Sequence, residues 1–342
     1  MATMPLARVH KPNDIRLDHV ESPKAGPNDV IVQVQRCGIC GSDLSYAKIG
    51  GIPGAPSPFA IGHEFAGIVT ESGKNVSHVA VGDRVVVNPE GAWNGIGSAG
   101  VKGAFAPYIQ FEDASQDPGA VIKLPDTIDF DLGALVEPLS VAMHGVDRGQ
   151  VGYGDKVAVF GAGPVGLGTA LVARYYGAQN VVITDLSEKR LAIARELGLT
   201  TFKADEGDIS DFLKQQHGSV MLGPLLGEQP ATDVLFEATG AGPVFHQILN
   251  LARKQARVVV IGVHFVPIEL DMINFLVREV SIIASQAYDN DVFLRVIAML
   301  ESGEVNVKPM ITHQFPLSEF GEAFAQASRQ NEAIKVIVNC QD

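Results

Sequence analysis

The segment Gly161-Ala-Gly163-Pro-Val-Gly166 constrains the fold most, because it joins an apolar run, Lys156–Phe160, to a helix-like run, Pro164–Tyr176. Glycines at these spacings allow a tight turn, close approach of a pyrophosphate and close helix–strand contact, while the helix N-terminus offers N–H groups to the anion. Asp185 ends the next apolar run, where an acidic side chain accepts hydrogen bonds from an adenosine ribose. The alternative is a glycine-rich turn without a ligand. The predicted cofactor-binding residues are Gly161, Gly163, Pro164, Val165, Gly166, Asp185 and Arg190.

The pattern of apolar residues differs between the two halves of the chain. Residues 29–36 alternate apolar and polar side chains, and similar short segments with glycine or proline between them follow up to about residue 111. From residue 156 onward strand-like and helix-like runs alternate, which is typical of parallel βαβ units. We therefore expect an α/β protein with a β-rich domain, residues 1–145, to which residues 288–342 return, and a Rossmann domain with a doubly wound parallel sheet, residues 146–287.

Composition excludes several classes of protein. The 342 residues are 46% hydrophobic and carry a formal net charge of -13, so an extensive core is expected and nucleic-acid binding is disfavoured. No apolar run approaches the roughly 18 residues of a membrane span, and the N-terminus lacks the apolar stretch of a signal peptide. These features predict a cytoplasmic protein without membrane partners. The three cysteines allow neither a disulfide framework nor a four-cysteine zinc site.

A second group of chemically active residues lies in the first half of the chain. Cys37 and Cys40 form a CxxC pair, His63 and Glu64 follow a glycine, and Glu137 lies far downstream. A thiolate, an imidazole and carboxylates suit tetrahedral Zn²⁺, and three protein ligands leave one position open for water or a substrate oxygen. Taken singly, these residues are equally consistent with a redox-active or buried inert thiol, a core histidine and a solvated glutamate.

Several motifs, in this order and spacing, resemble those of the zinc-dependent medium-chain alcohol dehydrogenases, especially the polyol and vicinal-diol branch. The motifs are CGICGSD, GHEFAGIV, VGDRVVVNP, GAFAPYI, EPLSVAMHG, GAGPVGLG and VVITDLSEKRLAIARELG. The resemblance implies a GroES-like catalytic domain split around the Rossmann domain. It also implies zinc ligation by Cys40 and His63, Glu64 as a direct or exchanging ligand, and Glu137 as a further ligand or a carboxylate behind the ligands.

The resemblance also implies roles for residues around the zinc. Ser42 would take the alcohol proton, with a helix N-cap as its alternative role and with Glu64 as the alternative proton acceptor. Tyr46 would line the substrate side. Zinc polarises an alcohol oxygen so that hydride can leave the carbinol carbon for the nicotinamide. Asp185 would repel a 2′-phosphate, with Arg190 as the nearest basic side chain, so NAD is expected in preference to NADP.

Three departures from the family pattern modify this expectation. Residues 88–104 contain no cysteine where many relatives carry a four-cysteine zinc lobe, so one zinc per chain is predicted. Ser45 stands where relatives often place a histidine at the outer end of a proton relay. Ala287 precedes Tyr288 where sorbitol dehydrogenases have an arginine, which weakens a strict sorbitol assignment.

The resulting functional hypothesis is the NAD-dependent, zinc-dependent oxidation of a polyol, sugar alcohol or vicinal diol by a homodimer or homotetramer. The sequence leaves two alternatives open. One is a zinc-free reductase of enones or quinones with the same fold, and the other is a nucleotide-binding protein without catalytic activity.

Overall fold

The computed structural model describes residues 2–224, 226–329 and 331–342, which form two compact units. Unit 1 contains residues 1–137, 289–303 and 311–342, and unit 2 contains residues 138–288 and 304–310. Helix α3 (Val136–Arg148) passes from the first unit to the second. Among the described residues, no helix is long and apolar enough to span a membrane.

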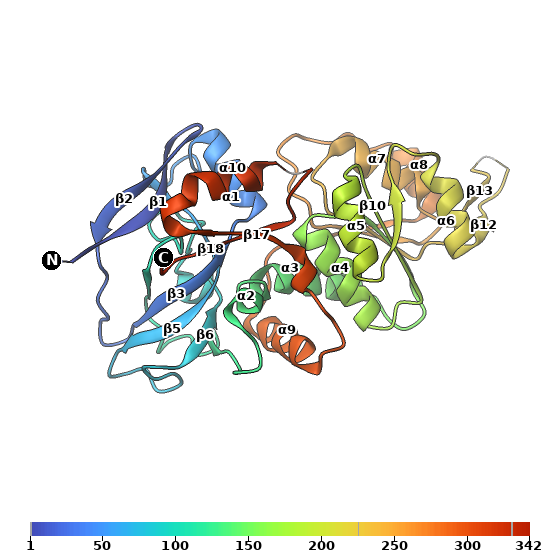
Figure 1. The fold of residues 1–342 in the computed structure, drawn as a ribbon. Coiled ribbons are helices and arrows are strands. Elements are labelled where there is room, and N and C mark those ends of the chain that lie inside the picture. Colours follow the sequence, from blue (N-terminus) through green and yellow to red (C-terminus); the bar gives the residue numbers. More distant parts are fainter. Residues whose placement is uncertain (1, 225, 330) are drawn as a thin grey trace. The chain divides into compact units, whose positions relative to one another are not determined.

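Unit 1 is rich in strands, as the alternating first third of the sequence predicts (Figure 1). Its elements before α3 are β1 (Thr3–Lys11), β2 (Asp14–Glu21), β3 (Val30–Gly38), α1 (Gly41–Ile49), β4 (Phe59–Ala60), β5 (Glu64–Ser72), β6 (Arg84–Val87), a 3-10 turn (Gly91–Trp93), β7 (Tyr108–Phe111), β8 (Val121–Lys123) and α2 (Phe130–Gly133). Its C-terminal elements are α9 (Asn290–Ser302), β17 (Ile311–Pro316), a 3-10 turn (Leu317–Glu319), α10 (Phe320–Ser328) and β18 (Lys335–Asn339).

The strands of unit 1 form two sheets over the described residues. One has the order β2-β1-β4, and the larger one has the order β17-β18-β3-β5-β6-β8, with β7 also paired to β3. Strand β18 pairs antiparallel with the end of β3, Ile337 opposite Gly38, so the C-terminal segment is an integral part of this sheet. Helix α10 packs on β17 and β18.

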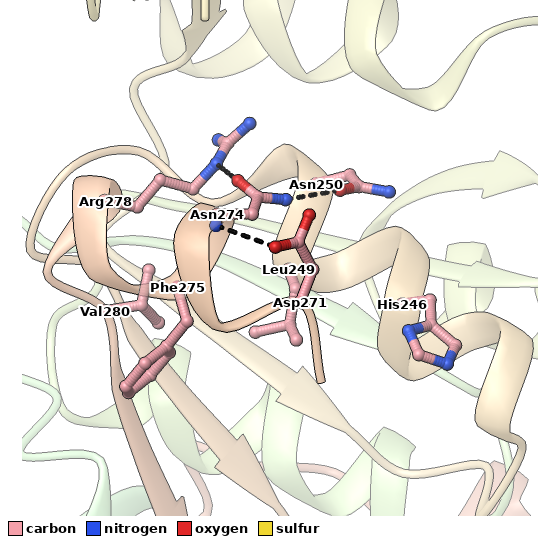
Figure 2. Close-up of a pocket in the computed structure, with 8 residues that line it drawn as sticks. All are labelled: His246, Leu249, Asn250, Asp271, Asn274, Phe275, Arg278 and Val280. Atoms are coloured by element: carbon pink, nitrogen blue, oxygen red, sulfur yellow. Dashed lines mark hydrogen bonds between the residues drawn. The ribbon is translucent and has the colours of Figure 1, made fainter. Parts of the chain in front are cut away.

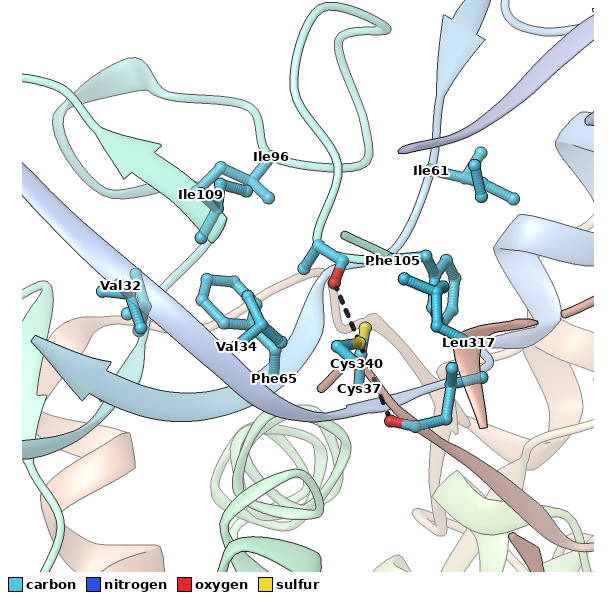
Figure 3. Close-up of a cluster of buried hydrophobic side chains, with 14 of the residues drawn as sticks. Val32, Val34, Cys37, Ile61, Phe65, Ile96, Phe105, Ile109, Leu317 and Cys340 are labelled. Carbon is cyan, nitrogen blue, oxygen red and sulfur yellow. Dashed lines mark hydrogen bonds between the residues drawn. The ribbon is translucent and has the colours of Figure 1, made fainter. Parts of the chain in front are cut away.

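The core of unit 1 includes two of the three cysteines (Figure 3). Cys37 and Cys340 are fully buried among apolar side chains, and their thiols donate to the carbonyl oxygens of Gly38 and Ala104. Burial raises the pKa of Cys340 to about 12 and that of Cys37 well above its ordinary value. Such thiols are chemically inert, which argues against a redox role for the CxxC pair.

Hydrogen bonds hold the cysteine-free loop of residues 88–104 in unit 1. The buried amide of Asn94 donates to the carbonyl oxygens of Gly91 (3.0 Å) and Glu112 (2.9 Å). Its oxygen accepts from Lys102 Nζ (2.8 Å) and from the backbone N–H of Glu112 (2.9 Å). With all its bonding groups satisfied, this amide joins two parts of the loop to the residue that follows β7.

Unit 2 contains the predicted alternation of strands and helices (Figure 1). Its first part comprises β9 (Lys156–Phe160), α4 (Pro164–Tyr175), β10 (Asn180–Asp185), α5 (Glu188–Glu196), β11 (Thr200–Lys203), α6 (Ile209–His217) and the hairpin β12 (Ser219–Met221) and β13 (Glu228–Pro230). Its second part comprises β14 (Val234–Glu237), α7 (Gly242–Leu251), β15 (Arg257–Val260), α8 (Met272–Arg278), β16 (Ser281–Ala284) and a 3-10 turn (Lys308–Met310).

The main sheet of unit 2 is parallel, with the order β11-β10-β9-β14-β15-β16. This is the strand order of a dinucleotide-binding Rossmann fold, in which the order reverses between the first and fourth strands. Here the reversal falls between β9 and β14. The predicted fold class, a GroES-like β-rich domain and a doubly wound Rossmann domain, is confirmed.

Some sequence-based boundaries are wrong. The apolar pattern predicts a strand over Ala104–Phe111, but the strand begins only at Tyr108, because residues 104–106 are buried in irregular backbone beside the His63 loop. The apolar pattern also predicts a single helix over Leu317–Ser328, but this segment begins as a 3-10 turn, and α10 starts at Phe320. Both differences arise at ends of elements, where tertiary packing outweighs local preference.

A buried histidine in unit 2 makes the stability of the protein depend on pH. His217 ends α6, its Nδ1 lies 2.8 Å from Thr232 Oγ1, and its buried Nε2 has no partner among the described residues. Burial, and then the positive charge of Lys156, lower the pKa of His217 from 6.5 to about 4. Because the unfolded chain binds a proton here between these two pH values and the folded chain does not, stability is lost as the pH falls through this window.

We expect His217 to account for about 3 kcal/mol of lost unfolding free energy between pH 6.5 and pH 4. Denaturant unfolding at several pH values should therefore show a shallower acid loss for His217→Gln than for the wild type. The exposed His246 on α7 provides the control, since His246→Gln should keep the wild-type slope. An equal slope in wild type and His217→Gln would show that His217 is not the group responsible.

Candidate active site

The first candidate ligand, Cys40, is positioned by the start of helix α1. Strand β3 ends at Gly38, and Cys40 is the N-cap residue of α1 in extended conformation. Asp43, three residues on, accepts a hydrogen bond from the Cys40 backbone N–H at 2.9 Å. This bond satisfies the backbone N–H group of the N-cap residue and fixes the cysteine.

The same carboxylate fixes the loop that carries His63. Asp43 is completely buried, and its other oxygen accepts from the backbone N–H of Gly62 at 3.1 Å and lies 3.7 Å from His63 Nδ1. Gly62 has φ +96°, and a Cβ there would lie 2.6 Å from the ring of Phe105, so only glycine fits. Burial raises the pKa of Asp43 against the opposing effect of His63.

Glu64 is placed by the pairing of β3 with β5. It begins β5 opposite Gly38, and a Cβ at Gly38 would lie only 2.2 Å from Glu64 Oε2. Lys335 Nζ, from β18, makes a short hydrogen bond to that oxygen and donates to the carbonyl oxygen of Ile39 at 3.1 Å. Both charged side chains are only 1% exposed. Burial lowers the pKa of Lys335, but the opposing effects of Glu64 and then Cys40 together leave that pKa raised above its ordinary value.

Three of the four predicted ligands come together. One ligand atom each from Cys40, His63 and Glu64 lie within 4.8 Å of one another. Glu137 is not a member of this group, although its negative charge acts on both His63 and Lys335. Among the described residues this is the one group of three or more histidine, cysteine or acidic side chains placed to hold a metal.

The chemistry of this donor set fits a zinc ion. Burial lowers the pKa of His63, but Asp43 and then Cys40 act in the opposite direction and raise it well above its ordinary value. The Nδ1 atom of His63 is buried without a hydrogen bond among the described residues. A site that favours positive charge, with one thiol, one imidazole and one carboxylate, has the ligand types that Zn²⁺ takes.

The structure places Ser42, the predicted proton acceptor, beside this group. Ser42 Oγ lies 3.5 Å from His63 Nε2. Because Cys40 occupies the N-cap position of α1, the alternative role of Ser42 as the helix cap is wrong. Ser45 Oγ donates to the carbonyl oxygen of Gly41 at 3.0 Å. The half-buried ring of Tyr46 packs against Phe59, with ring centroids 5.2 Å apart.

In unit 2, the glycines following β9 have the geometry that dinucleotide binding requires. Gly161 has φ +106°, and a Cβ at Gly166 would lie 1.8 Å from the Gly161 carbonyl oxygen. Gly163 caps α4, with Pro164 and Val165 opening the helix, and a Cβ at Gly163 would meet only Arg190 Nη1, at 3.8 Å. The tight turn and the close helix contact are thus both present, and the backbone at Gly163 is open to a ligand.

Asp185 ends β10 and faces this turn. Its carboxylate accepts from the backbone N–H groups of Ala162 (2.7 Å) and Ser187 (2.8 Å). Arg190 Nη1 lies 3.8 Å away, and burial lowers the pKa of Arg190 while Asp185 opposes this. A carboxylate has about four lone-pair sites, so Asp185 retains capacity for further donors.

Sequence reasoning missed Lys335 as a site residue. The signal that could have identified it is a lysine inside the apolar run Ala333–Val338, where a charged side chain requires a buried partner. The partner itself, Glu64, is 271 positions away and could not be inferred from spacing.

A small pocket elsewhere in unit 2 does not compete with these sites (Figure 2). Its volume is about 30 Å³, room for one water molecule. Its polar groups bond to one another: Arg278 Nε donates to Asn274 Oδ1 at 2.6 Å, and Asn274 Nδ2 donates to Asn250 Oδ1 at 2.9 Å. Little bonding capacity is left for a ligand.

Fold and site together define a dehydrogenase with a metal-ligand group and a dinucleotide turn. Comparison with known proteins leads to the same class. Residues 26–126 match the alcohol dehydrogenase GroES-like domain, and residues 164–302 match the zinc-binding dehydrogenase family. Sorbitol dehydrogenase of Mus musculus is 37% identical over 97% of this chain and 94% of that protein, and that of Homo sapiens is 35% identical with the same coverage. The crystal structure of 2R,3R-butanediol dehydrogenase from Bacillus subtilis superposes with a TM-score of 0.85 at 30% identity, covering 98% of this chain and 99% of that one.

The chain therefore belongs to the zinc-dependent medium-chain alcohol dehydrogenases, in the branch that contains the polyol and butanediol dehydrogenases. This confirms the family predicted from the motifs. The protein is an oxidoreductase, and its cofactors are zinc and NAD.

Proposed function

We propose that this enzyme oxidises a secondary alcohol group of a polyol, sugar alcohol or vicinal diol to the ketone and transfers the hydride to NAD. The observation that carries the proposal is the meeting of the ligand atoms of Cys40, His63 and Glu64 within 4.8 Å. The substrate class follows that of the relatives, which are sorbitol and butanediol dehydrogenases.

Each site residue receives a role in this proposal. Cys40 and His63 hold the zinc, Glu64 is a direct ligand or exchanges between the ion and Lys335, and Glu137 is a carboxylate behind the ligands. When bound, zinc supplies Lewis acidity toward an alcohol oxygen, and NAD supplies the hydride acceptor. Ser42 accepts the alcohol proton, since its hydroxyl lies next to His63, and Tyr46 borders the substrate.

The alternatives make different demands on this site. A zinc-free reductase has no use for a cysteine, a histidine and a glutamate brought together beside a buried lysine. A nucleotide-binding protein without activity has no use for a serine hydroxyl beside the ligands. The ligand group therefore favours the zinc-dependent oxidation over both.

The proposal is tested by measuring NAD⁺ reduction by the zinc-loaded protein over a panel of polyols, vicinal diols, simple secondary alcohols and amino alcohols. We expect the highest kcat/KM among polyols or diols. Activity confined to enones or quinones that survives removal of zinc would favour the first alternative. Absence of any turnover with bound zinc and bound NADH would favour the second.

We expect NAD⁺ to be preferred over NADP⁺. In Asp185→Ala, the ratio of kcat/KM for NAD⁺ to kcat/KM for NADP⁺ should decrease. The KM for NAD⁺ should rise about 10- to 100-fold, because a hydrogen bond to a charged acceptor made in ground and transition states alike is lost. Steady-state kinetics with both cofactors measures this. The control Asp205→Ala removes the same charge from an exposed position after β11 and should leave the ratio unchanged. A wild-type preference for NADP⁺ would remove Asp185 from the cofactor site.

We also propose that the enzyme is a homodimer or homotetramer whose contact includes the edge of the unit 2 sheet. Strand β16 is the last strand of that sheet, and exposed apolar side chains lie on the chain just before it, in and around α8. They are Val263, Phe265, Val266, Leu270, Met272, Ile273, Leu276 and Val277. An edge strand beside such a surface can pair with the same strand of a second copy. Light scattering tests this, with Ile273→Glu expected to shift the protein toward monomer.

The cytoplasm is the proposed location. Its support is that all three cysteines are free thiols, two of them in the core of unit 1, which suits a reducing compartment.

A further inference from the structure

A buried carboxylate in unit 2 holds a histidine that takes no part in the proposed zinc binding or proton transfer. Glu237 ends β14 and is fully buried. One of its oxygens accepts from the backbone N–H groups of Thr239 (2.8 Å) and Gly240 (3.0 Å), and makes a short bond with the Thr239 hydroxyl. Its other oxygen lies 2.9 Å from His264 Nε2. Every bond to this carboxylate thus serves to fix the turn after β14 and the imidazole ring.

The second nitrogen of His264 is available for a ligand. An ionised carboxylate only accepts hydrogen bonds, so the proton of a neutral His264 ring is assigned to Nε2, and Nδ1 is left as an acceptor. No hydrogen bond to Nδ1 occurs within the described part of the chain. Glu237 holds the imidazole ring at Nε2. Because the His264 side chain is 14% exposed, the ring remains accessible to a ligand.

The place of His264 in the fold identifies the ligand. A Cβ at Gly161 would lie 3.0 Å from the carbonyl oxygen of Ala238, and one at Gly240 would lie 2.5 Å from that of Val263. The turns that follow β9, β14 and β15 therefore touch in succession along the carboxyl edge of the sheet. A dinucleotide crosses this edge where the strand order reverses, each half of the sheet facing one nucleotide.

Asp185, at the end of β10, assigns the adenosine to the half formed by β9, β10 and β11. The half formed by β14, β15 and β16 then faces the nicotinamide nucleotide, and His264 follows β15. The nicotinamide riboside offers two kinds of hydrogen-bond donor, ribose hydroxyls and the carboxamide N–H groups.

We infer that His264 is a cofactor-binding residue whose Nδ1 accepts a hydrogen bond from the nicotinamide riboside half of NAD. Glu237 is its positioning residue, because it sets both the orientation of the ring and the nitrogen that carries the proton. This inference rests on the proposed function, since it requires that the hydride acceptor bound in unit 2 is a nicotinamide dinucleotide.

Two substitutions separate the two nitrogens of the ring. In His264→Gln the amide reaches the position of Nε2, so the bond to Glu237 is kept and the acceptor at Nδ1 is lost. In His264→Asn the amide reaches the position of Nδ1, so an acceptor is kept and the bond to Glu237 is lost. His246→Gln, on the exposed face of α7, is the matched control.

The test measures Kd for NADH by fluorescence and for ADP-ribose and ADP by calorimetry, using the full-length zinc-loaded protein. We expect His264→Gln to raise the Kd for NADH about fivefold, which corresponds to the loss of one neutral hydrogen bond. The Kd for ADP should be unchanged. His264→Asn should lie closer to wild type, and His246→Gln should equal it. If His264→Gln also binds ADP-ribose more weakly than the wild type, the contact is to a ribose hydroxyl. If its ADP-ribose binding is unchanged, the contact is to the carboxamide.

The inference is overturned if His264→Gln binds NADH with the wild-type Kd, or if its binding of ADP is weakened as much as its binding of NADH. Either result leaves the proposed function intact, because the wild type still binds NADH. A wild-type protein that fails to bind NADH would overturn the proposed function and this inference with it.

Discussion

Cys40→Ala protein is expected to lose both its zinc and its dehydrogenase activity, whereas the wild type should hold about one zinc per chain. The thiolate is the one sulfur donor in the ligand group, and its two partners, His63 and Glu64, remain too few to hold the ion tightly. Because a Lewis acid supplies several kcal/mol of transition-state stabilisation, kcat/KM should fall on the order of 10³-fold or more. Metal analysis of protein purified without chelator, together with NAD⁺ reduction assays, measures both quantities.

Cys37→Ala is the matched control for this prediction. Cys37 belongs to the same CxxC pair but lies in the core of unit 1, so its removal should affect stability and leave zinc and activity in place. Loss of zinc in both variants would contradict the assignment of Cys40 alone. Two zinc ions per wild-type chain would reveal a second metal site in addition to the Cys40 group.

The second large effect concerns the buried ion pair. Lys335→Met should lower the unfolding free energy of the zinc-free protein by about 3–5 kcal/mol, because the Glu64 carboxylate then stays buried without its partner. With zinc bound, the ion beside Glu64 offsets part of that charge, so the loss should be smaller. Denaturant unfolding with and without zinc measures both values.

A double variant and a surface control sharpen this test. Combining Lys335→Met with Glu64→Gln removes both charges and should restore much of the lost stability. Lys123 pairs with Asp83 at the surface, where its side chain is 59% exposed, and Lys123→Met should cost less than about 1 kcal/mol. If the effects of the two single substitutions simply add, the pair is not coupled as the structure indicates.

Features that depend on neighbouring residues could be predicted from the sequence. The dinucleotide turn is one of them. The positive φ of Gly161 requires a glycine, and so does Gly166, where a Cβ would lie 1.8 Å from the Gly161 carbonyl oxygen. Both requirements arise within a single strand–turn–helix unit and are therefore visible in the local sequence. The alternation from β9 to β16 is another, since apolar period and turn residues encode it locally. A serine at position 187 before a helix-like run likewise predicts a helix cap, and Ser187 caps α5.

The candidate site was only partly predictable. Cys40, His63 and Glu64 were identified by residue type and family motifs, and their meeting follows from the register of β3 with β5, which spacing alone does not set. Glu137 was predicted with them, but the structure leaves it outside the group of ligand atoms.

The distant residues that complete the sites are specified by the packing of the folded chain. Lys335 reaches Glu64 because β18 returns to pair with β3, and His264 meets Glu237 because two βα turns touch at one edge of the sheet. The partners of these polar groups lie 271 and 27 residues away. The local sequence does not identify such partners. A buried polar group needs a hydrogen-bonding partner, but the fold can supply that partner from any part of the chain, so the neighbouring residues are not constrained.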